Sequence, residues 1–470
     1  MRAFAKRFLT ALISLCILLD LAAPVQSTAA LNVYVNDTVR RANTYNYGLT
    51  ISRSGKRLSR KKIGKRIKDY GTYGDTPGMP TAEYIEAMDF KWRDVTRSSK
   101  KWKRTGVSLT KKYSYKKLVK IMRKLSAYDG VYMYYIGRST SGKPMYALDV
   151  DLTRCAEADK HTVLLTGQVH ARETAGPTFI LKEIADLLNA YIDGDKAAKK
   201  VLWNTRYVAV ACVNPDGHDG IAYHVDDWTY DDDQLWKATS NGTDLNRNFP
   251  GLSWMQLKTG NKKTKYASTT PDKLYYWGDY AGSCSETKAM MKFYQFFIGV
   301  EHAEMLIDYH QQGRITYAGK GYVPDHNNEL CESLRTACYD TQKDGDLGEC
   351  YTYCYDDTDE DYGLICTGST NTDYAWAVAI GAMFSTKYGF SVYTDTAGKE
   401  YPLIMIPDYD EAEVELTGMR VPEFRQLSWE IGYGKKYLGY SKDTRELLKD
   451  EYYNYNFDEM LYTYAAELNK

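Results

Sequence analysis

The chain has 470 residues, of which 44% are hydrophobic and 26% are charged, and its formal net charge is zero. This composition excludes a chain that is disordered throughout, and the length allows one large domain with an extension or two domains. The neutral total hides an uneven distribution, because residues 31–110 contain 18 Lys and Arg against 7 Asp and Glu.

The first thirty residues have the pattern of a secretory signal peptide. Basic residues precede an apolar run, Phe8–Leu19, and small residues at 27–30 offer a cleavage site. The run is shorter than the roughly 20 residues that a membrane-spanning helix needs. We therefore predict removal of residues 1–30 and a secreted or cell-wall-associated protein without a stable membrane span. An uncleaved anchor is the alternative.

Residues 31–110 form a basic N-terminal region, in which 52–68 is a dense run of Lys and Arg. We predict a propeptide, a spacer or a wall-binding surface. Anionic cell-wall polymers would attract this charge. Nucleic acid is not an expected partner, because an exported protein has little access to it.

Eight cysteines remain after Cys16 of the signal region is removed, and five of them lie between Cys331 and Cys366. This stretch belongs to a predicted Cys-rich insertion at about residues 320–366. Export permits disulfides. A second metal site is a weaker interpretation, because no His lies within the cluster. Eight cysteines allow 105 pairings, so no pairing is predicted.

From Tyr113 onward, strand and helix patterns alternate, which predicts an α/β fold. We expect a single large domain, residues 111–470, with a mixed, largely parallel central sheet flanked by helices. The expected strands are 131–137, 145–151, 162–166, 207–213, 304–309 and 425–431, and the expected helices are 115–125, one beginning near Pro177, 288–300 and the final segment 444–468.

His170 and Glu173 follow the strand at 162–166 and precede the helix near Pro177. Open α/β sheets place their sites where a strand ends and a helix begins. An imidazole and a carboxylate at this spacing can bind one ion, and a catalytic zinc takes three protein ligands and a water. The pair therefore indicates half of a zinc site, although His-x-x-Glu alone also occurs by chance.

Three further motifs, at 214–217 (NPDG), 244–250 (DLNRNFP) and 306–310 (LIDYH), follow in order. With these motifs, the chain from about Tyr113 to the C-terminus resembles zinc metallocarboxypeptidases of the carboxypeptidase A type. The resemblance implies a carboxypeptidase-like fold and one Zn²⁺ ion. The implied ligands are His170, Glu173 and His310, and Asp244 would orient His170.

The resemblance also implies the catalytic and substrate-binding residues. Glu430 would act as the base for the zinc-bound water and then as the proton donor to the leaving amine. Asn246 and Arg247 would bind the terminal carboxylate of the substrate, since a guanidinium can grip a carboxylate with two hydrogen bonds. Arg172 matches an additional substrate-binding arginine. The alternative for both arginines is a solvent-facing salt bridge.

Two features depart from the family pattern. Lys237 stands where animal digestive relatives carry an arginine that polarises the scissile carbonyl, and lysine cannot make the two-pronged contact. The separation of His310 and Glu430 is long, which the Cys-rich insertion accounts for. For substrate selection, Thr372 lies near the position that sorts side chains, and Tyr362 is the nearest candidate for the tyrosine that closes over substrate.

The expected function is that of an exported zinc exopeptidase that hydrolyses an amide bond near a free C-terminal carboxylate. The stretch 236–250 is more similar to bacterial members of the family, some of which cut the γ-D-glutamyl-diaminopimelate bond of wall peptides. The substrate is therefore either an ordinary peptide or a murein peptide. A catalytically silent relative that binds peptides or cell-wall fragments is the alternative.

Overall fold

A computed structural model describes residues 91–97, 103–224, 236–249, 271, 275, 276, 278, 282–318 and 425–469, together with four short strands between 351 and 406. All of them belong to one compact unit, which includes Thr81–Lys470. The predicted signal peptide and most of the basic N-terminal region lie outside the described residues.

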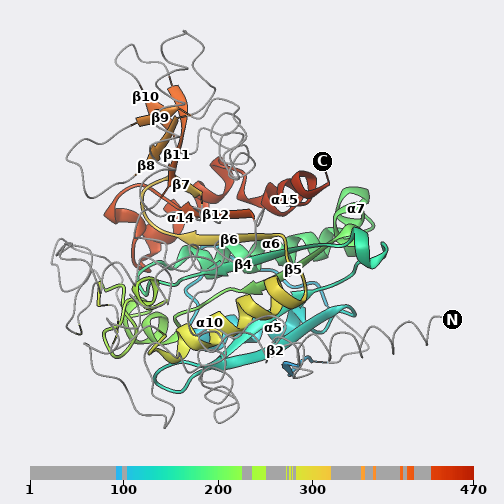
Figure 1. Cartoon of the computed structure of the whole chain (residues 1–470), viewed down its shortest axis with the longest axis horizontal. Helices are drawn as coiled ribbons and strands as arrows, with labels where there is room; N and C mark the ends of the chain where they lie inside the picture. The colour runs from blue at the N-terminus through green and yellow to red at the C-terminus, as the bar shows by residue number, and fades with distance from the viewer. Residues whose placement is uncertain are drawn as a thin grey trace, which may run out of the picture. The chain divides into compact units, whose positions relative to one another are not determined.

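The unit is built on one sheet with the strand order β1-β2-β3-β5-β4-β6-β12-β7-β11-β8-β9, and β10 pairs with β11 (Figure 1). Its central strands, β5, β4, β6 and β12, run parallel, whereas β2, β3 and β5 pair antiparallel toward one edge. The predicted mixed, largely parallel sheet is confirmed. The strands are β1 (Arg93–Asp94), β2 (Val131–Arg138), β3 (Pro144–Val150), β4 (His161–Gly167), β5 (Thr205–Val210), β6 (Met305–His310), β7 (Ile315–Ala318), β8 (Tyr351–Cys354), β9 (Leu364–Cys366), β10 (Val392–Thr394), β11 (Glu400–Ile406) and β12 (Arg425–Glu430).

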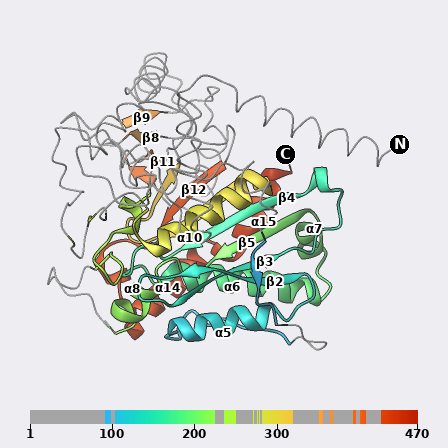
Figure 2. The same cartoon turned by 60° about the horizontal axis from the view of Figure 1, so that its bottom comes forward.

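Helices cover both faces of this sheet. Figure 2 shows α10 on one side and α5 and α6 on the other. Gly137 of β2 is where α10 comes close, because a Cβ there would lie 2.6 Å from Cβ of Ala289. The helices are α5 (Tyr115–Leu125), α6 (Ala175–Ile192), α7 (Lys196–Asn204), α8 (Pro215–Gly217), α10 (Ser285–Tyr294), α14 (Lys442–Asn454) and α15 (Met460–Leu468).

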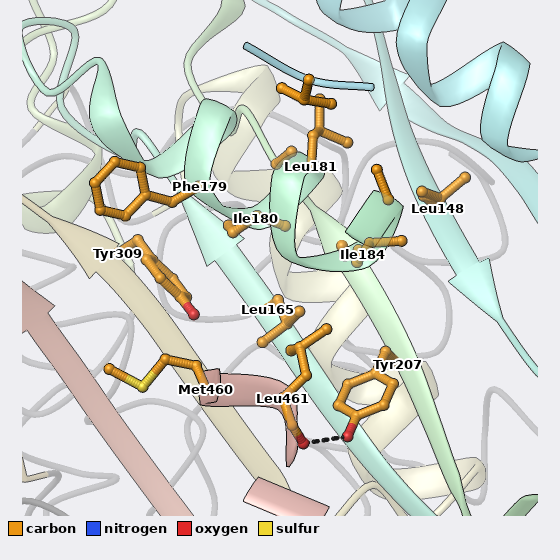
Figure 3. Packing of buried hydrophobic residues seen from close by; sticks show 14 of the residues in the cluster. Leu148, Leu165, Phe179, Ile180, Leu181, Ile184, Tyr207, Tyr309, Met460 and Leu461 are labelled. Atoms are coloured by element: carbon orange, nitrogen blue, oxygen red, sulfur yellow. Dashed lines mark hydrogen bonds between the residues drawn. The ribbon is translucent and has the colours of Figure 1, made fainter. Parts of the chain in front are cut away.

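Helix α6 is buried nearly all round, which its sequence explains. It runs beside β4 and β6 and also contacts α5, α7 and α15. Apolar residues such as Phe179, Ile180 and Leu181 leave it no polar face toward solvent in its first half, as expected of a helix inside a core. Figure 3 shows these side chains against Leu165 of β4 and Tyr309 of β6.

The C-terminal helix closes the same core. The hydroxyl of Tyr207 on β5 donates a 2.6 Å hydrogen bond to the carbonyl of Leu461 on α15 (Figure 3). Tyr207, Leu461 and Met460 are all nearly inaccessible to solvent. The end of the chain is therefore part of the packed domain.

Several elements differ from the sequence-based expectation in their bounds. Helix α6 begins at Ala175, two residues before Pro177. The expected helix at 288–300 is α10 followed by a π-helical segment, Gln295–Val300. The expected final helix, 444–468, is two helices, α14 and α15, because Asn456 between them has a left-handed backbone with a φ of 50°.

Strands β8 and β9 lie within the predicted Cys-rich insertion and pair antiparallel at the edge of the sheet. Upstream of residue 111, β1 pairs with β2, and Val107 and Leu109 belong to the core cluster. Cys155, Cys212 and Cys284 are free thiols. Within the described part of the chain, no helix is long and apolar enough to cross a membrane.

Candidate metal centre

The metal-ligand loop, residues 168–174, connects β4 to α6. Two glycines allow it to be tight, because a Cβ on Gly176 would lie 3.0 Å from the carbonyl oxygen of Tyr309 and 3.1 Å from Cα of Gly167. The first N–H of α6, on Ala175, donates a 2.7 Å hydrogen bond to the side chain of Gln311, the residue after His310. The loop is therefore held directly against the end of β6.

The NPDG segment holds the other side of the metal-ligand loop. The amide nitrogen of Asn214 lies within hydrogen-bonding distance of the carbonyls of Val169, Lys237 and Ala238. The backbone N–H of Ala171 also donates to the carbonyl of Lys237, at 2.9 Å. Asn214 thus joins the loop to the segment that carries the substrate-binding candidates.

Three side chains converge at the carboxyl ends of β4 and β6: those of His170, Glu173 and His310. Nδ1 of His170 lies 2.7 Å from one carboxylate oxygen of Glu173, and Nδ1 of His310 lies 2.8 Å from the other. The two Nδ1 atoms are 3.2 Å apart. The ligand candidates that the sequence predicts are therefore brought together, each through an atom able to bind a metal.

The cluster is buried, since none of its three residues exposes more than 3% of its surface. Burial alone would raise the pKa of Glu173, but the charges of His170 and His310 and their hydrogen bonds hold it below its ordinary value. Glu173 is therefore a carboxylate at neutral pH. Asp244 and Asp308, also buried, lie beside the histidines. Buried carboxyl groups require compensating partners, and a metal ion would supply one.

These donor atoms fit zinc. Two imidazole nitrogens and one carboxylate make a three-ligand set with an open fourth position, as in catalytic zinc sites. Tetrahedral ligands at about 2.0–2.1 Å from zinc are about 3.3 Å from each other, and the separations here are 2.7–3.2 Å. Small movements of the side chains suffice to bind the ion.

Each histidine ring has a carboxylate on its other nitrogen. Nε2 of His170 lies 3.3 Å from Oδ1 of Asp244, the partner that the family resemblance implies. Burial would raise the pKa of Asp244, but the nearby charge of His170 lowers it below its ordinary value. Nε2 of His310 lies 2.8 Å from Oδ2 of Asp308, a residue that sequence reasoning missed. The available signal was Asp308's position two residues before His310, on the same face of β6.

Glu430 stands beside the cluster. It is the last residue of β12 and the register partner of His310 on β6, so the two side chains leave the same face of neighbouring parallel strands. Glu430 is half-buried, and Cβ of Gly313, if added, would lie 3.4 Å from its Cβ. Pairing of β6 with β12 thus brings together residues that are far apart in the chain.

Asn246 and Arg247 follow Asp244 in a short 3₁₀ turn, Leu245–Arg247, which Asp244 caps by accepting a 3.0 Å hydrogen bond from the N–H of Asn246. The side chain of Asn246 is fully buried, yet neither its oxygen nor its nitrogen has a hydrogen-bond partner among the described residues. Such a group costs free energy unless a ligand or water supplies the partner.

Two of the predicted cationic residues, Arg247 and Lys237, lie near the same aromatic ring. The Arg247 guanidinium and the Lys237 ammonium lie 5.7 and 5.6 Å from the centre of the Tyr275 ring. Arg172 is half-buried and precedes Glu173, the carboxylate of the candidate metal cluster, in the chain. Thr372 and Tyr362 fall outside the described residues, so their predicted roles stay predictions.

Two other histidines of the described chain lie outside the cluster. His161 begins β4, at the end opposite the cluster, and pairs with Glu304 at 2.7 Å. His218 is buried and contacts the side-chain oxygen of Gln168 at 2.9 Å and the carbonyl of Tyr113 at 2.8 Å.

This sheet, with a His-Glu-His cluster at the carboxyl ends of its strands, has the arrangement expected of a metallocarboxypeptidase. The profile of the zinc carboxypeptidase family, Peptidase M14, matches residues 118–399, more than half of the chain. The chain belongs to this family, and the resemblance inferred from its motifs is confirmed.

Similar proteins include carboxypeptidase Z of Rattus norvegicus, 27% identical over 192 residues that make up 39% of this chain and 28% of that protein. The inactive metallocarboxypeptidase ECM14 of Saccharomyces cerevisiae is 26% identical over 171 residues, 34% of this chain and 37% of its own. Both matches span well under two thirds of the relative's length. Among solved structures, carboxypeptidase A from Helicoverpa armigera aligns with a TM-score of 0.48 at 15% identity, over 79% of this chain and 77% of its own.

Proposed function

We propose that this protein is a zinc-dependent exopeptidase that hydrolyses the amide bond nearest a free C-terminal carboxylate. The observation that carries the proposal is the register pairing of Glu430 with His310, a member of the three-residue metal cluster, which supports a catalytic role for the Glu430 carboxylate. A binding protein without catalysis has no chemical need for that additional carboxylate next to its ligands.

The proposed roles follow from what each group can do. His170, Glu173 and His310 would hold zinc, which when bound activates water and polarises the scissile carbonyl. Glu430 would take the proton from the attacking water and deliver it to the leaving amine. Lys237 would assist at the scissile carbonyl as a single charge.

Recognition of the free carboxylate is assigned to Asn246, Arg247 and Arg172. The buried amide of Asn246, without a partner among the described residues, supports this role. Arg247 supplies the opposite charge and a planar pair of donors. We include export after removal of residues 1–30 in the proposal, on the evidence of the N-terminal sequence pattern.

The test is mass spectrometry of products after incubation of the zinc-loaded chain with peptides. The panel contains ordinary peptides with free or amidated C-termini, and murein tripeptides and tetrapeptides. Stepwise loss of C-terminal residues from the free peptides supports a carboxypeptidase, and release of diaminopimelate alone supports a murein peptidase. Equal cleavage of amidated peptides contradicts the proposed recognition of the carboxylate.

Glu430→Gln is the matched variant, because glutamine keeps the shape of the side chain but cannot accept the proton. We expect zinc binding to be unchanged and the hydrolysis rate to fall by roughly 10²–10⁴-fold. No product from the zinc-bound, folded wild type would favour the silent peptide-binding alternative, for which an inactive relative in the family is a precedent.

A further inference from the structure

Asp308 lies on β6, two residues before His310, and therefore on the same face of the strand. Its Oδ2 lies 2.8 Å from Nε2 of His310, and its Oδ1 accepts a 2.8 Å hydrogen bond from the hydroxyl of Thr166 on β4. Asp308, His310 and Thr166 are all fully buried. Each oxygen of the Asp308 carboxylate thus lies close to a partner, one on the ring of His310 and the other on the hydroxyl of Thr166.

The register of the sheet explains why these groups meet. Thr166 and Asp308 are register partners on the neighbouring parallel strands β4 and β6. Ser428, on β12, is the partner of Asp308 on the other side, and its hydroxyl is buried with no hydrogen-bond partner among the described residues. A row of polar side chains therefore crosses three neighbouring strands. On β6 and β12 it lies two residues before the row that contains His310 and Glu430.

We propose that Asp308 and Thr166 are a positioning pair for the metal ligand His310. A carboxylate beside Nε2 favours the ring tautomer with its hydrogen on Nε2, which leaves the Nδ1 lone pair for the metal. Thr166 fixes the carboxylate, and it stands on the strand that leads into the metal-ligand loop. Asp308 acts through His310 and is therefore a positioning residue.

The contact between Asp308 and His310 is one of proximity and charge. The two atoms lie at hydrogen-bonding distance, but the ring N–H is not aligned with the oxygen. An acceptor oxygen at this distance favours a hydrogen on Nε2, and the buried setting strengthens the preference because water screens the interaction little. The positioning pair acts on metal binding, so its effect does not depend on whether the protein hydrolyses peptides.

A role of Asp308 in binding a cationic substrate side chain is the competing explanation. It would require the substrate to displace His310 or Thr166 from a carboxylate that is inaccessible to solvent. The observed contacts favour the positioning role, and zinc affinity distinguishes the two.

The experiment measures zinc affinity of the full chain by competition with a chelator, together with the absorption spectrum of the cobalt-substituted protein. For Asp308→Ala we expect zinc binding weaker by roughly 10–100-fold and a changed cobalt spectrum. Asp308→Asn keeps one oxygen beside the ring and should recover part of the affinity. Thermal unfolding of the metal-free variants checks that each one folds.

Thr166→Val removes the hydroxyl at constant shape, and we expect it to weaken zinc binding by less than about tenfold, since the carboxylate remains. Thr166→Ser keeps the hydroxyl and should bind zinc as the wild type does. Thr162→Val is the matched control, because Thr162 is buried on the same face of β4, farther from the metal. Its affinity should not change.

Wild-type zinc affinity in folded Asp308→Ala and Thr166→Val would overturn the proposal. So would an equal loss in Thr162→Val, which would mean that any polar change in the sheet disturbs the site. Unchanged zinc affinity with altered preference for substrate side chains would assign Asp308 to substrate selection instead.

If Asp308→Ala does not fold, the zinc affinities of Thr166→Val and Thr166→Ser decide. No peptide enters the zinc measurement, so absence of hydrolysis would contradict the proposed function and leave this inference intact.

Discussion

At the scale of single residues, Asn246 should show opposite effects on stability and on catalysis. Its amide is buried without a partner among the described residues. Leucine has nearly the same shape, so Asn246→Leu should raise the free energy of unfolding by about 1 kcal/mol, because an unsatisfied polar group is removed. The same change should lower kcat/KM for peptides with a free C-terminus by roughly 10–100-fold, the loss of a hydrogen bond to a charged group.

The measurements are chemical denaturation of the substrate-free protein and peptide kinetics. Amidated peptides serve as the control, because they lack the carboxylate and should lose much less rate in the variant. If Asn246→Leu destabilises the protein by several kcal/mol, then the amide makes stabilising contacts with water or protein, and the substrate role loses its physical support.

The residues that the sequence could predict are those in short motifs. His170 and Glu173 stand three apart after an apolar strand, and His310 ends another such strand. Asp308 is only two residues from His310, but its meaning depends on Thr166, which is 142 residues away. Only the register of β4 with β6 brings them together, and the sequence of neither strand predicts that register.

At the scale of elements, the start of α6 leaves little room for a side chain at Gly176. A Cβ there would lie 3.0–3.2 Å from backbone atoms of Tyr309, Gly167 and Gln168, and backbone cannot move as a side-chain end does. We expect Gly176→Ala to destabilise the metal-free protein by about 1–3 kcal/mol through overpacking. Zinc affinity should fall as well, since α6 would move away from β6 and carry Glu173 with it.

Gly106→Ala is the control for this prediction. No atom lies within 4 Å of the position of its Cβ, so stability and zinc affinity should stay within experimental error of the wild type. Urea unfolding and chelator competition on both variants provide the comparison. A stable Gly176→Ala protein with wild-type zinc affinity would show that the helix start is not closely held.

The element boundaries show where local pattern is a good guide. Helix α5 begins and ends where the apolar spacing predicts, since Leu118, Ile121 and Leu125 form one buried face. Helix α7 was missed, although Asp195 before it accepts a 2.7 Å hydrogen bond from the N–H of Ala198 and is a usual helix cap. The break at Asn456 was also missed, because asparagine in a left-handed conformation leaves no trace in hydrophobic spacing.

At the scale of the whole molecule, the order of the strands in the sheet could not be predicted from patterns in the sequence. Strand β12 lies between β6 and β7, although β7 follows β6 directly in the chain. Hydrophobic alternation gives the existence of each strand but not its neighbour. The resemblance to a family gave the general fold, and with it the expectation that Glu430 belongs near the metal.

The pH dependence of overall stability provides a further prediction. Glu286, on α10, accepts hydrogen bonds from the backbone and hydroxyl of Thr140, in the turn between β2 and β3. Burial raises its pKa from 4.5 to about 7, although these hydrogen bonds act in the other direction. Because the pKa of Glu286 is higher in the folded protein than in the unfolded chain, protonation of this group stabilises the fold. The stabilisation is fully present at pH values below 4.5, the pKa in the unfolded chain, and is lost as pH rises through about 7, the pKa in the folded protein.

Glu286→Gln carries a neutral side chain at every pH and can still pair with Thr140, so it mimics the protonated form. The variant should gain stability relative to the wild type as pH rises from 5 to 8, up to a limit of about 3 kcal/mol. Denaturant unfolding of both proteins at several pH values measures this difference, and groups common to both cancel. A difference that stays constant over this range would mean that Glu286 ionises as easily in the folded protein as in the unfolded chain, and that water reaches the contact between α10 and the β2–β3 turn.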